Sequence, residues 1–297
     1  MRILLTGARG LLGSECVGVL HPRHDLLTPD RGELDITAAP QVDEVVARLR
    51  PEVILNCAAF TQVDLCETRQ EQAFAANVAG PRHLALAAAR HGAYLIHIST
   101  DYVFDGRKPP PTPYEEDDPT GPLSWYGRTK LAGELAVQEA GGRSAIVRTS
   151  WLYGRRGSSF LKKILAAALN PAIPELKVVD DQFGCPTWAR RLAEQLARLL
   201  EAGATGIFHA AAQGHCTWFG LASRFLALMG IAKPLRPCPS RDYPTPAVRP
   251  HNSILATRRL MAAGLHCLRP WQEDLEEFVR EAGADLLREA RGLKADG

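Results

Sequence analysis

Apolar residues occur along this chain in two alternating patterns. Short, nearly continuous apolar runs are typical of buried strands, and they occupy residues 2–6, 25–28, 53–56, 94–98 and 145–149. Between them, apolar residues recur at helical spacing over 11–20, 42–49 and 67–90, the last segment being alanine-rich and containing Asn77. Strands that alternate with helices of this length predict an α/β fold with a Rossmann-type, doubly wound parallel sheet.

A glycine-rich turn joins the first predicted strand to the first predicted helix. Gly7, Gly10 and Gly13 have the spacing Gly-x-x-Gly-x-x-Gly. Glycines at such a turn let backbone amides approach a pyrophosphate at the amino end of a helix, where the partial positive charge favours an anion. The turn therefore predicts a dinucleotide site, with a simple tight turn as the alternative.

The second half of the chain has a weaker alternation. Helical patterns cover 160–169, 189–200, 218–229 and 271–288, and strand-like runs cover 176–179 and 206–210. We therefore predict an NAD(P)-binding Rossmann domain over 1–152 and a mainly substrate-binding, smaller domain over 153–297, with about 176–212 returning to the sheet. The proline-rich segment 234–250 is suited to forming the wall of a pocket.

Composition excludes several classes of protein. The 297 residues are 46% hydrophobic, and the formal net charge of +2 comes from well-mixed charges, so nucleic acid is not an expected partner. No apolar run approaches the roughly 18–20 residues of a membrane span, and no secretory signal precedes the first strand, so we expect a cytoplasmic protein and no membrane partner. Seven cysteines without a Cys-x-x-Cys pair predict neither a disulfide framework nor a zinc site.

The choice between NADH and NADPH is left open by the residues after the second predicted strand. An acid that binds the ribose hydroxyls favours NADH, whereas an arginine accommodates the 2′-phosphate of NADPH. Asp30 and Arg31 are adjacent there, and Asp35 follows. The expected cofactor is therefore NADPH or NADH.

Candidate catalytic residues gather around residues 99–130. Tyr126 and Lys130 are four residues apart at the start of a predicted helix, so they share one face. A nearby ammonium lowers the pKa of a phenol, which makes the tyrosine usable as a proton donor or acceptor. Ser99, Thr100 and Asp101 end a predicted strand, and ligands bind beyond the carboxyl ends of strands in such sheets.

Together these motifs resemble the extended short-chain dehydrogenase/reductase family and, within it, the dTDP-4-dehydrorhamnose reductases. The likeness runs along essentially the whole chain, and its most particular motifs lie in the second half. The matching strings are the three glycines, Ser99 to Gly106, Tyr126 to Glu134, Arg148 to Gly154, Asp181 to Thr187 and Tyr243 to Ser253.

The resemblance implies NAD(P)H-dependent reduction of the C4 keto group of dTDP-4-dehydro-L-rhamnose. Tyr126 would protonate the developing alkoxide, Lys130 would hold the nicotinamide ribose and lower the tyrosine pKa, and Thr100 would bind the substrate oxygen. Substrate-contacting positions match Asp101 and Trp151. Cofactor-contacting positions match Gly10, Leu11, Leu12, Asp35, Ile36, Ala59, Phe60 and Thr61.

Each substrate-contacting residue has an alternative. Asp101 could cap the following turn, Trp151 could be a core aromatic, and Asn56 and Asn77 could satisfy backbone groups. Arg249 lies in the proline-rich wall, where its fork suits a diphosphate, but it could instead pair with a surface acid.

Mg²⁺ is implied by family analogy only. Some relatives are dimers bridged by Mg²⁺ through carboxylates, and Glu15 falls at one ligand position. Arg190 stands where a second carboxylate would be expected, so no metal ligands are assigned and a homodimer is left open.

Two other classes of function compete with reduction. A sugar-nucleotide dehydratase usually carries an adjacent Asp-Glu after the threonine, but Tyr102 follows Thr100-Asp101 here; a C4 epimerase needs only the Tyr/Lys pair and stays open. A non-catalytic regulatory subunit, as in methionine adenosyltransferase, would not need Thr100, Tyr126 and Lys130 to be intact.

Overall fold

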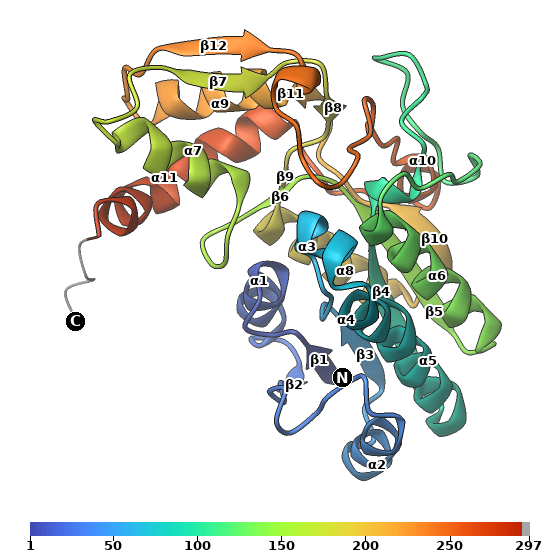
Figure 1. Ribbon diagram of the computed structural model, residues 1–297. Coiled ribbons are helices and arrows are strands. Elements are labelled where there is room, and N and C mark those ends of the chain that lie inside the picture. The colour runs from blue at the N-terminus through green and yellow to red at the C-terminus, as the bar shows by residue number, and fades with distance from the viewer. Residues whose placement is uncertain (293–297) are drawn as a thin grey trace.

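The central element of the computed structural model, which describes residues 1–292, is a six-stranded sheet (Figure 1). All its strand pairs are parallel and the order is β10-β5-β4-β3-β1-β2. The strands are β1 (Arg2–Thr6), β2 (Asp25–Leu27), β3 (Val53–Asn56), β4 (Tyr94–Thr100), β5 (Ser144–Thr149) and β10 (Gly206–His209). β2 and β3 pair with opposite edges of β1, so successive strands are added to the sheet on both sides of β1. This arrangement confirms the predicted doubly wound topology.

Helices cover both faces of this sheet because successive strand side chains point to opposite sides. Ile3 and Leu5 pack with α1 (Leu11–Leu20) and α8 (Ala189–Ala202) in one core. Leu4 packs on the other face, with α2 (Ala39–Leu49) and α5 (Gly80–His91). Tyr126 and Lys130 lie on α6 (Trp125–Glu139), which packs beside α5 on this second face.

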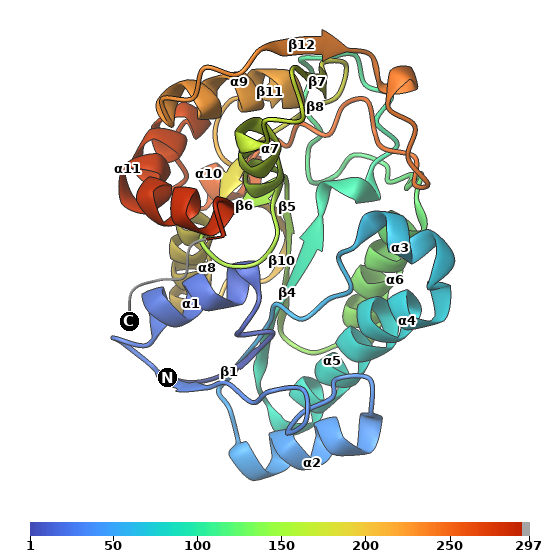
Figure 2. The same ribbon diagram turned by 60° about the vertical axis from the view of Figure 1, so that its left-hand side comes forward.

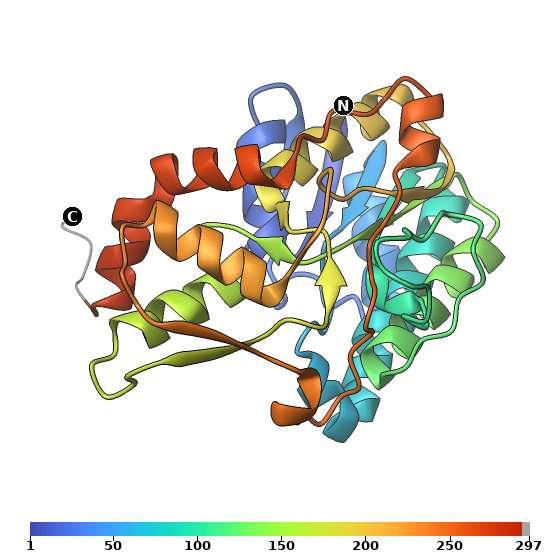
Figure 3. The same cartoon turned by 90° about the horizontal axis from the view of Figure 1, so that it is seen from above.

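A second hydrophobic core lies in the carboxyl-terminal half, beside the main sheet (Figures 2 and 3). It is built from α7 (Phe160–Leu169), α9 (Trp218–Leu228), α11 (Trp271–Ala290) and the parallel pair β7 (Leu176–Val179) and β12 (Leu235–Cys238). Short pairs join this part to the sheet: β6 (Leu152–Tyr153) with β9 (Thr187–Trp188), and β8 (Phe183–Gly184) with β11 (Cys216–Thr217). The proline-rich segment carries the short helix η3 (Ser240–Asp242), and α10 (Arg258–Ala262) follows it.

The predicted return of 176–212 to the sheet is seen for part of that segment. β10 extends the sheet beside β5, with Phe208 opposite Val147, and α8 packs against α1. β7, in contrast, pairs only with β12. The boundary at residue 152 stays a prediction.

The prediction of one continuous helix over 67–90 is wrong. The segment is divided into the end of α3 (Val63–Thr68), α4 (Gln70–Phe74), the π-helical turn η1 (Ala75–Ala79) and α5. Pro81 is the second residue of α5 and has no N–H to donate to the preceding turn, and α6 approaches the π-helical turn so closely that a Cβ on Gly133 would lie 2.1 Å from Asn77 O. A π-helical turn inside a helix often marks a functional site.

Within residues 1–292, no helix has the combined length and apolar character that crossing a membrane requires.

Candidate active site

The glycine turn places the amino end of α1 against the ends of β1 and β3. Gly7 has φ +68°, and a Cβ there would lie 2.8 Å from Ala58 N. A Cβ on Gly13 would lie 2.1 Å from Gly7 O, so the helix can approach the turn only with glycine at this position. Gly10 precedes the helix, and no side chain caps the first backbone N–H groups. These free donors at a helix amino end fit a pyrophosphate.

A cavity of about 810 Å³ opens beside this turn. Six of the predicted cofactor-contacting residues line it, namely Gly7, Gly10, Asp35, Ile36, Ala59 and Phe60. Leu11, Leu12 and Gly13 form the first turn of α1 behind it, and Thr61 follows Phe60 outside the lining. Its size and its position at the switch point between β1 and β3 fit a dinucleotide.

Asn77 fixes one wall of this cavity. Its amide accepts a hydrogen bond from Phe60 N at 2.8 Å and donates to Phe60 O at 3.0 Å. It also donates to Thr129 Oγ1 on α6 at 3.1 Å. Asn77 thus satisfies backbone groups, as the alternative reading anticipated, and ties the predicted cofactor loop to the helix that carries Tyr126. Asn56 is likewise used internally, accepting from Thr6 Oγ1 at 2.6 Å and facing His97 Nδ1 at 3.0 Å.

Both carboxylates at the outer end of the cavity are already engaged. Asp30 accepts from the backbone N–H groups of Gly32 and Glu33 and pairs with Arg9 at 3.4 Å. Asp35 accepts from Thr37, and these bonds lower its pKa; Arg31 lies 3.5 Å away. The Arg9 and Arg31 side chains are 84% and 85% exposed, so both can turn towards an anion.

Thr100 and Asp101 lie at the carboxyl end of β4, as predicted. Thr100 Oγ1 donates to Asp101 Oδ1 at 3.0 Å, and Ser150 Oγ donates to Asp101 Oδ2 at the same distance. Thr100 is opposite Thr149 on β5, which is why Ser150 arrives beside Asp101. Burial raises the pKa of Asp101 to about 6, although hydrogen bonds from Ser253, Thr100 and Ser150 oppose the shift. Asp101 does not cap the following turn through its side chain. The capping hydrogen bond is donated by Tyr102 N and accepted by Thr100 Oγ1.

Helix α6 brings Tyr126 to the same strand end. Ser124 caps the helix by accepting a hydrogen bond from Gly127 N. A Cβ on Gly127 would lie 2.2 Å from Tyr102 O, so glycine allows the helix to lie directly against the turn after β4. The Tyr102 ring packs edge-on against Tyr126, with centroids 5.6 Å apart. Burial raises the pKa of Tyr126, and the neighbouring Thr100 hydroxyl opposes that shift.

Lys130 lies one turn below Tyr126 and is almost completely buried. Its ammonium donates to Ile98 O on β4 at 2.7 Å. Burial lowers its pKa to about 8, while Glu134 on the next turn acts in the opposite direction.

The predicted lowering of the Tyr126 pKa by Lys130 is wrong. Burial raises the pKa of the phenol, and this effect exceeds that of the Thr100 hydrogen bond. The lysine is turned towards the strand carbonyl, so its charge is used there. The phenol, like that of any tyrosine with a pKa of about 10 or above, is protonated at neutral pH and so carries a proton to donate.

Trp151 and Arg249 each contact a side chain that is distant in the sequence. Trp151 follows β5 with φ +45° and stacks on Trp218 of α9. Arg249 forms a two-pronged ion pair with Asp64 of α3, at 3.1 and 2.8 Å. The alternative of pairing with an acid is therefore the arrangement seen for Arg249, and its binding of a diphosphate stays a prediction.

The carboxylates near Glu15 do not form a metal site. Arg190 donates to Glu281 at 2.7 and 3.0 Å, and Arg155 donates to the same carboxylate at 2.8 Å. Burial raises the pKa of Glu15 nearby. Two guanidinium groups thus supply the positive charge, and residues 1–292 contain no cluster of three metal-ligating side chains. The residues present do not fit the Mg²⁺ of the family analogy.

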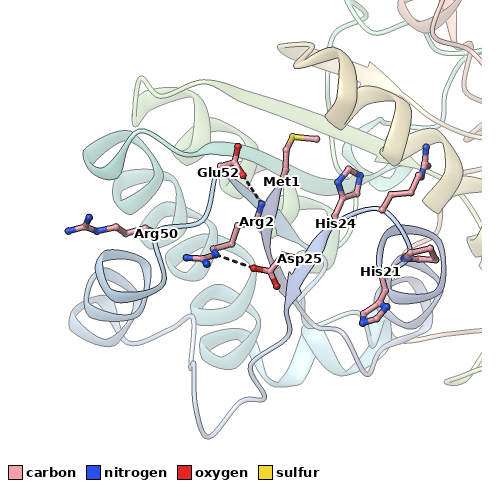
Figure 4. A pocket seen from close by; sticks show the side chains of 9 residues that line it. Met1, Arg2, His21, His24, Asp25, Arg50 and Glu52 are labelled. Carbon is pink, nitrogen blue, oxygen red and sulfur yellow. Dashed lines mark hydrogen bonds and ion pairs between the residues drawn. The ribbon is translucent and has the colours of Figure 1, made fainter.

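A second hollow, of about 580 Å³, lies at the opposite edge of the sheet (Figure 4). It surrounds the amino ends of β1 and β2, where Arg2 pairs with Asp25 at 3.2 Å and its backbone N–H donates to Glu52. Ligands of doubly wound sheets bind at the carboxyl ends of strands, so we place the active site at the first cavity.

Ser150 and Ser253 are site residues to which the sequence reasoning assigned no role. Both appear in the recognised motifs, and both hold Asp101 in place. The position of Ser150 directly after β5 could have indicated its place at the site, because neighbouring parallel strands end at one edge. No local pattern marks Ser253, which reaches the site from 152 residues downstream of Asp101 (253 − 101).

Known proteins resemble the chain over nearly its full length. The family described as RmlD substrate binding domain matches residues 1–283. A dTDP-4-dehydrorhamnose reductase of Streptomyces griseus is 46% identical over 93% of this chain and 92% of its own. A dTDP-4-keto-6-deoxy-D-glucose reductase of Streptomyces niveus is 40% identical over 96% of this chain and 98% of its own. The crystal structure of dTDP-4-dehydrorhamnose reductase from Bacillus anthracis in complex with NADP is 36% identical, covers 94% of this chain and 99% of its own, and superposes with a TM-score of 0.90.

Proposed function

The chain belongs to the dTDP-4-dehydrorhamnose reductase family, and from that membership and its site we propose that it reduces the C4 keto group of dTDP-4-dehydro-L-rhamnose to give dTDP-L-rhamnose. It is an oxidoreductase that uses a nicotinamide cofactor. The observation that carries the proposal is the placement of Thr100, Tyr126 and Lys130 at the strand edge that also bears the dinucleotide cavity.

The cofactor, when bound, supplies the hydride that adds to the carbonyl carbon. The residues of the chain then handle the oxygen. Tyr126, whose phenol is protonated at neutral pH, donates its proton to the alkoxide as the C–O double bond becomes single. Thr100 orients that oxygen through its hydroxyl, and Lys130 holds the nicotinamide ribose.

Three further residues are proposed to hold the substrate. Asp101 is buried and bonded to Thr100, and Trp151 follows Ser150, which donates to the same carboxylate, and packs against the second hydrophobic core. Arg249 would exchange Asp64 for the diphosphate, since both ligands offer a pair of oxygens to its fork. We also propose a cytoplasmic location, which the seven free cysteines support.

The test of this function is a panel of nucleotide 4-keto-6-deoxysugars, each assayed with NADPH and NADH. Stoichiometric loss of reduced cofactor with dTDP-4-dehydro-L-rhamnose, and formation of dTDP-L-rhamnose, is the expected result. Preferred turnover of dTDP-4-keto-6-deoxy-D-glucose would move the assignment to the activity named for the Streptomyces niveus relative. Interconversion of sugars without loss of reduced cofactor would indicate an epimerase instead.

We propose NADPH as the preferred cofactor, on the basis of the charged side chains at the cavity. Asp30 uses one carboxylate oxygen for backbone N–H groups and the other for Arg9, so its ability to accept ribose hydroxyls is reduced. Arg9 and Arg31 are the exposed cations beside it, and a 2′-phosphate would find both within the cavity lining. The related enzyme from Bacillus anthracis was crystallised with NADP.

Replacing Arg9 and Arg31 together by alanine should therefore raise the KM for NADPH by roughly tenfold or more, because charged hydrogen bonds to the phosphate are lost. The KM for NADH should change little. Steady-state kinetics with each cofactor at saturating sugar nucleotide measure the difference.

Arg23→Ala is the matched control, since Arg23 is also exposed and ion-paired but lies at the opposite edge of the sheet. Equal losses with NADPH and NADH in the double variant would show that the arginines do not bind the 2′-phosphate.

A further inference from the structure

We propose that Trp218 is a positioning residue for substrate: it holds the indole of Trp151 in place through a stack and a chain of hydrogen bonds. The inference rests on the proposed function, in which Trp151 contacts the sugar nucleotide. It adds a residue from the second hydrophobic core to the machinery that the motifs identified.

The backbone of Trp151 needs external support. Its φ of +45° lies in the left-handed region, which a bulky side chain rarely adopts because Cβ approaches the following carbonyl oxygen. Such a conformation persists only where the surroundings determine it. The surroundings here are β9, whose Thr187 N donates to Trp151 O at 3.2 Å, and the ring of Trp218.

The two indoles overlap almost completely. Their ring centroids are 3.4 Å apart and their planes differ by 4°. Free aromatic rings prefer offset or edge-to-face arrangements, because their electron-rich faces repel one another. The neighbours must therefore impose the full overlap.

Two neighbours hold the pair together from outside. A Cβ on residue 184 would lie 2.3 Å from Trp151 Cε2, so the backbone of Gly184 is in direct contact with that ring. Phe160 of α7 packs against Trp218, with centroids 4.5 Å apart. The stack is thus enclosed between a strand and a helix.

A chain of hydrogen bonds fixes the rotation of Trp218 within its plane. Trp218 Nε1 donates to Gln182 Oε1 at 3.1 Å, and Gln182 Nε2 donates to Ser240 Oγ at 2.8 Å. Ser240 N in turn donates to Asp181 at 2.9 Å. The chain links α9, the segment before β8 and the proline-rich wall, so Trp218 transmits the position of that wall to Trp151.

This arrangement separates the effect of Trp218 on the substrate from any effect on the cofactor. Trp218 and Gln182 lie in or beside the second hydrophobic core, whereas the dinucleotide cavity is lined by residues 6–76. Loosening Trp151 should raise the KM for the sugar nucleotide and leave the KM for NADPH unchanged.

The test compares Trp218→Leu, which removes the stack, with Trp218→Phe, which keeps an aromatic face. For Trp218→Leu we expect loss of the exciton couplet that two closely stacked indoles with twisted transition moments produce in the far-ultraviolet circular dichroism spectrum. We also expect weaker binding of dTDP-L-rhamnose by calorimetry and a higher sugar-nucleotide KM, each by roughly three- to tenfold, the usual worth of an aromatic pair. Trp218→Phe should regain most of the binding.

Trp271→Phe is the control, because Trp271 belongs to the same hydrophobic core and its Nε1 has no partner in the described chain. It should leave both the couplet and dTDP-L-rhamnose binding unchanged. If Trp218→Leu does not fold, Gln182→Met tests the same chain of hydrogen bonds by removing both the acceptor of the indole N–H and the donor to Ser240, and it should weaken dTDP-L-rhamnose binding in the same direction.

Normal sugar-nucleotide binding in a folded Trp218→Leu that has lost the couplet would overturn the proposal, as would normal binding in Gln182→Met if Trp218→Leu is unfolded. Failure of the proposed function would appear separately, as a wild-type enzyme that neither binds dTDP-L-rhamnose nor consumes NADPH.

Discussion

Tyr126→Phe should lower kcat by about 10²–10⁴-fold, the usual contribution of a general acid, while the KM for cofactor stays nearly the same. The substitution removes the one proton donor that reaches Thr100 from α6 and keeps the ring that packs against Tyr102. The pocket therefore keeps its shape and loses its acid. Steady-state kinetics with dTDP-4-dehydro-L-rhamnose and NADPH measure both parameters.

Tyr153→Phe provides the matched control. Tyr153 is also buried, and its hydroxyl has no hydrogen-bond partner in the part of the chain that is described, so the same chemical change should leave turnover intact. Near-normal turnover in Tyr126→Phe would contradict the mechanism and would move the proton donor to another group, with Asp101 as the nearest buried acid.

The dinucleotide half could be predicted closely because its signals are local. Gly7 has a positive φ, Gly13 approaches Gly7 O within the same turn, and each apolar run became a strand of the parallel sheet. The π-helical turn at Asn77 was missed because its cause is distant in sequence. The turn lies against Gly133 of α6, and the alanine-rich helical spacing of the sequence continues through the turn.

The sequence predicted which residue types form the site, but it did not predict the hydrogen bonds and pKa shifts of those residues. The motif places Tyr126 and Lys130 on one helix, and periodicity cannot show that the lysine is bonded to Ile98 O or that burial decides the phenol pKa. Arg249 is a similar case. Its partner Asp64 lies 185 residues away and on a different element, which a single sequence does not connect.

The largest effect on stability should come from separating Glu134 and Arg148. Arg148 Nε and Nη2 donate to the two oxygens of Glu134 at 3.0 and 2.8 Å, and Ser99 Oγ also donates to that carboxylate. The side chains are only 4% and 1% exposed for Arg148 and Glu134, respectively. The pair joins α6 to β4 and β5, directly below the helical turn that carries Lys130.

Arg148→Met should therefore lower the free energy of unfolding by about 3–5 kcal/mol, because it leaves a carboxylate buried without its counter-charge. Glu134→Leu should cost a similar amount by isolating the guanidinium, which is held otherwise by Glu116 O at 3.4 Å and the Phe104 ring. Urea titration followed by circular dichroism measures both. Arg288→Met is the control, since its pair with Asp285 is exposed on α11 and should contribute no more than about 1 kcal/mol.

The double variant, Glu134→Leu with Arg148→Met, distinguishes charge from packing. If the loss in each single variant comes from a stranded charge, removing both charges should restore much of the stability, because apolar side chains of similar size can replace a buried ion pair. If the two losses instead add, the cost lies in side-chain volume and in the contacts with Ser99 and Phe104. Additive losses would contradict the conclusion that the ion pair holds the catalytic helix against the sheet.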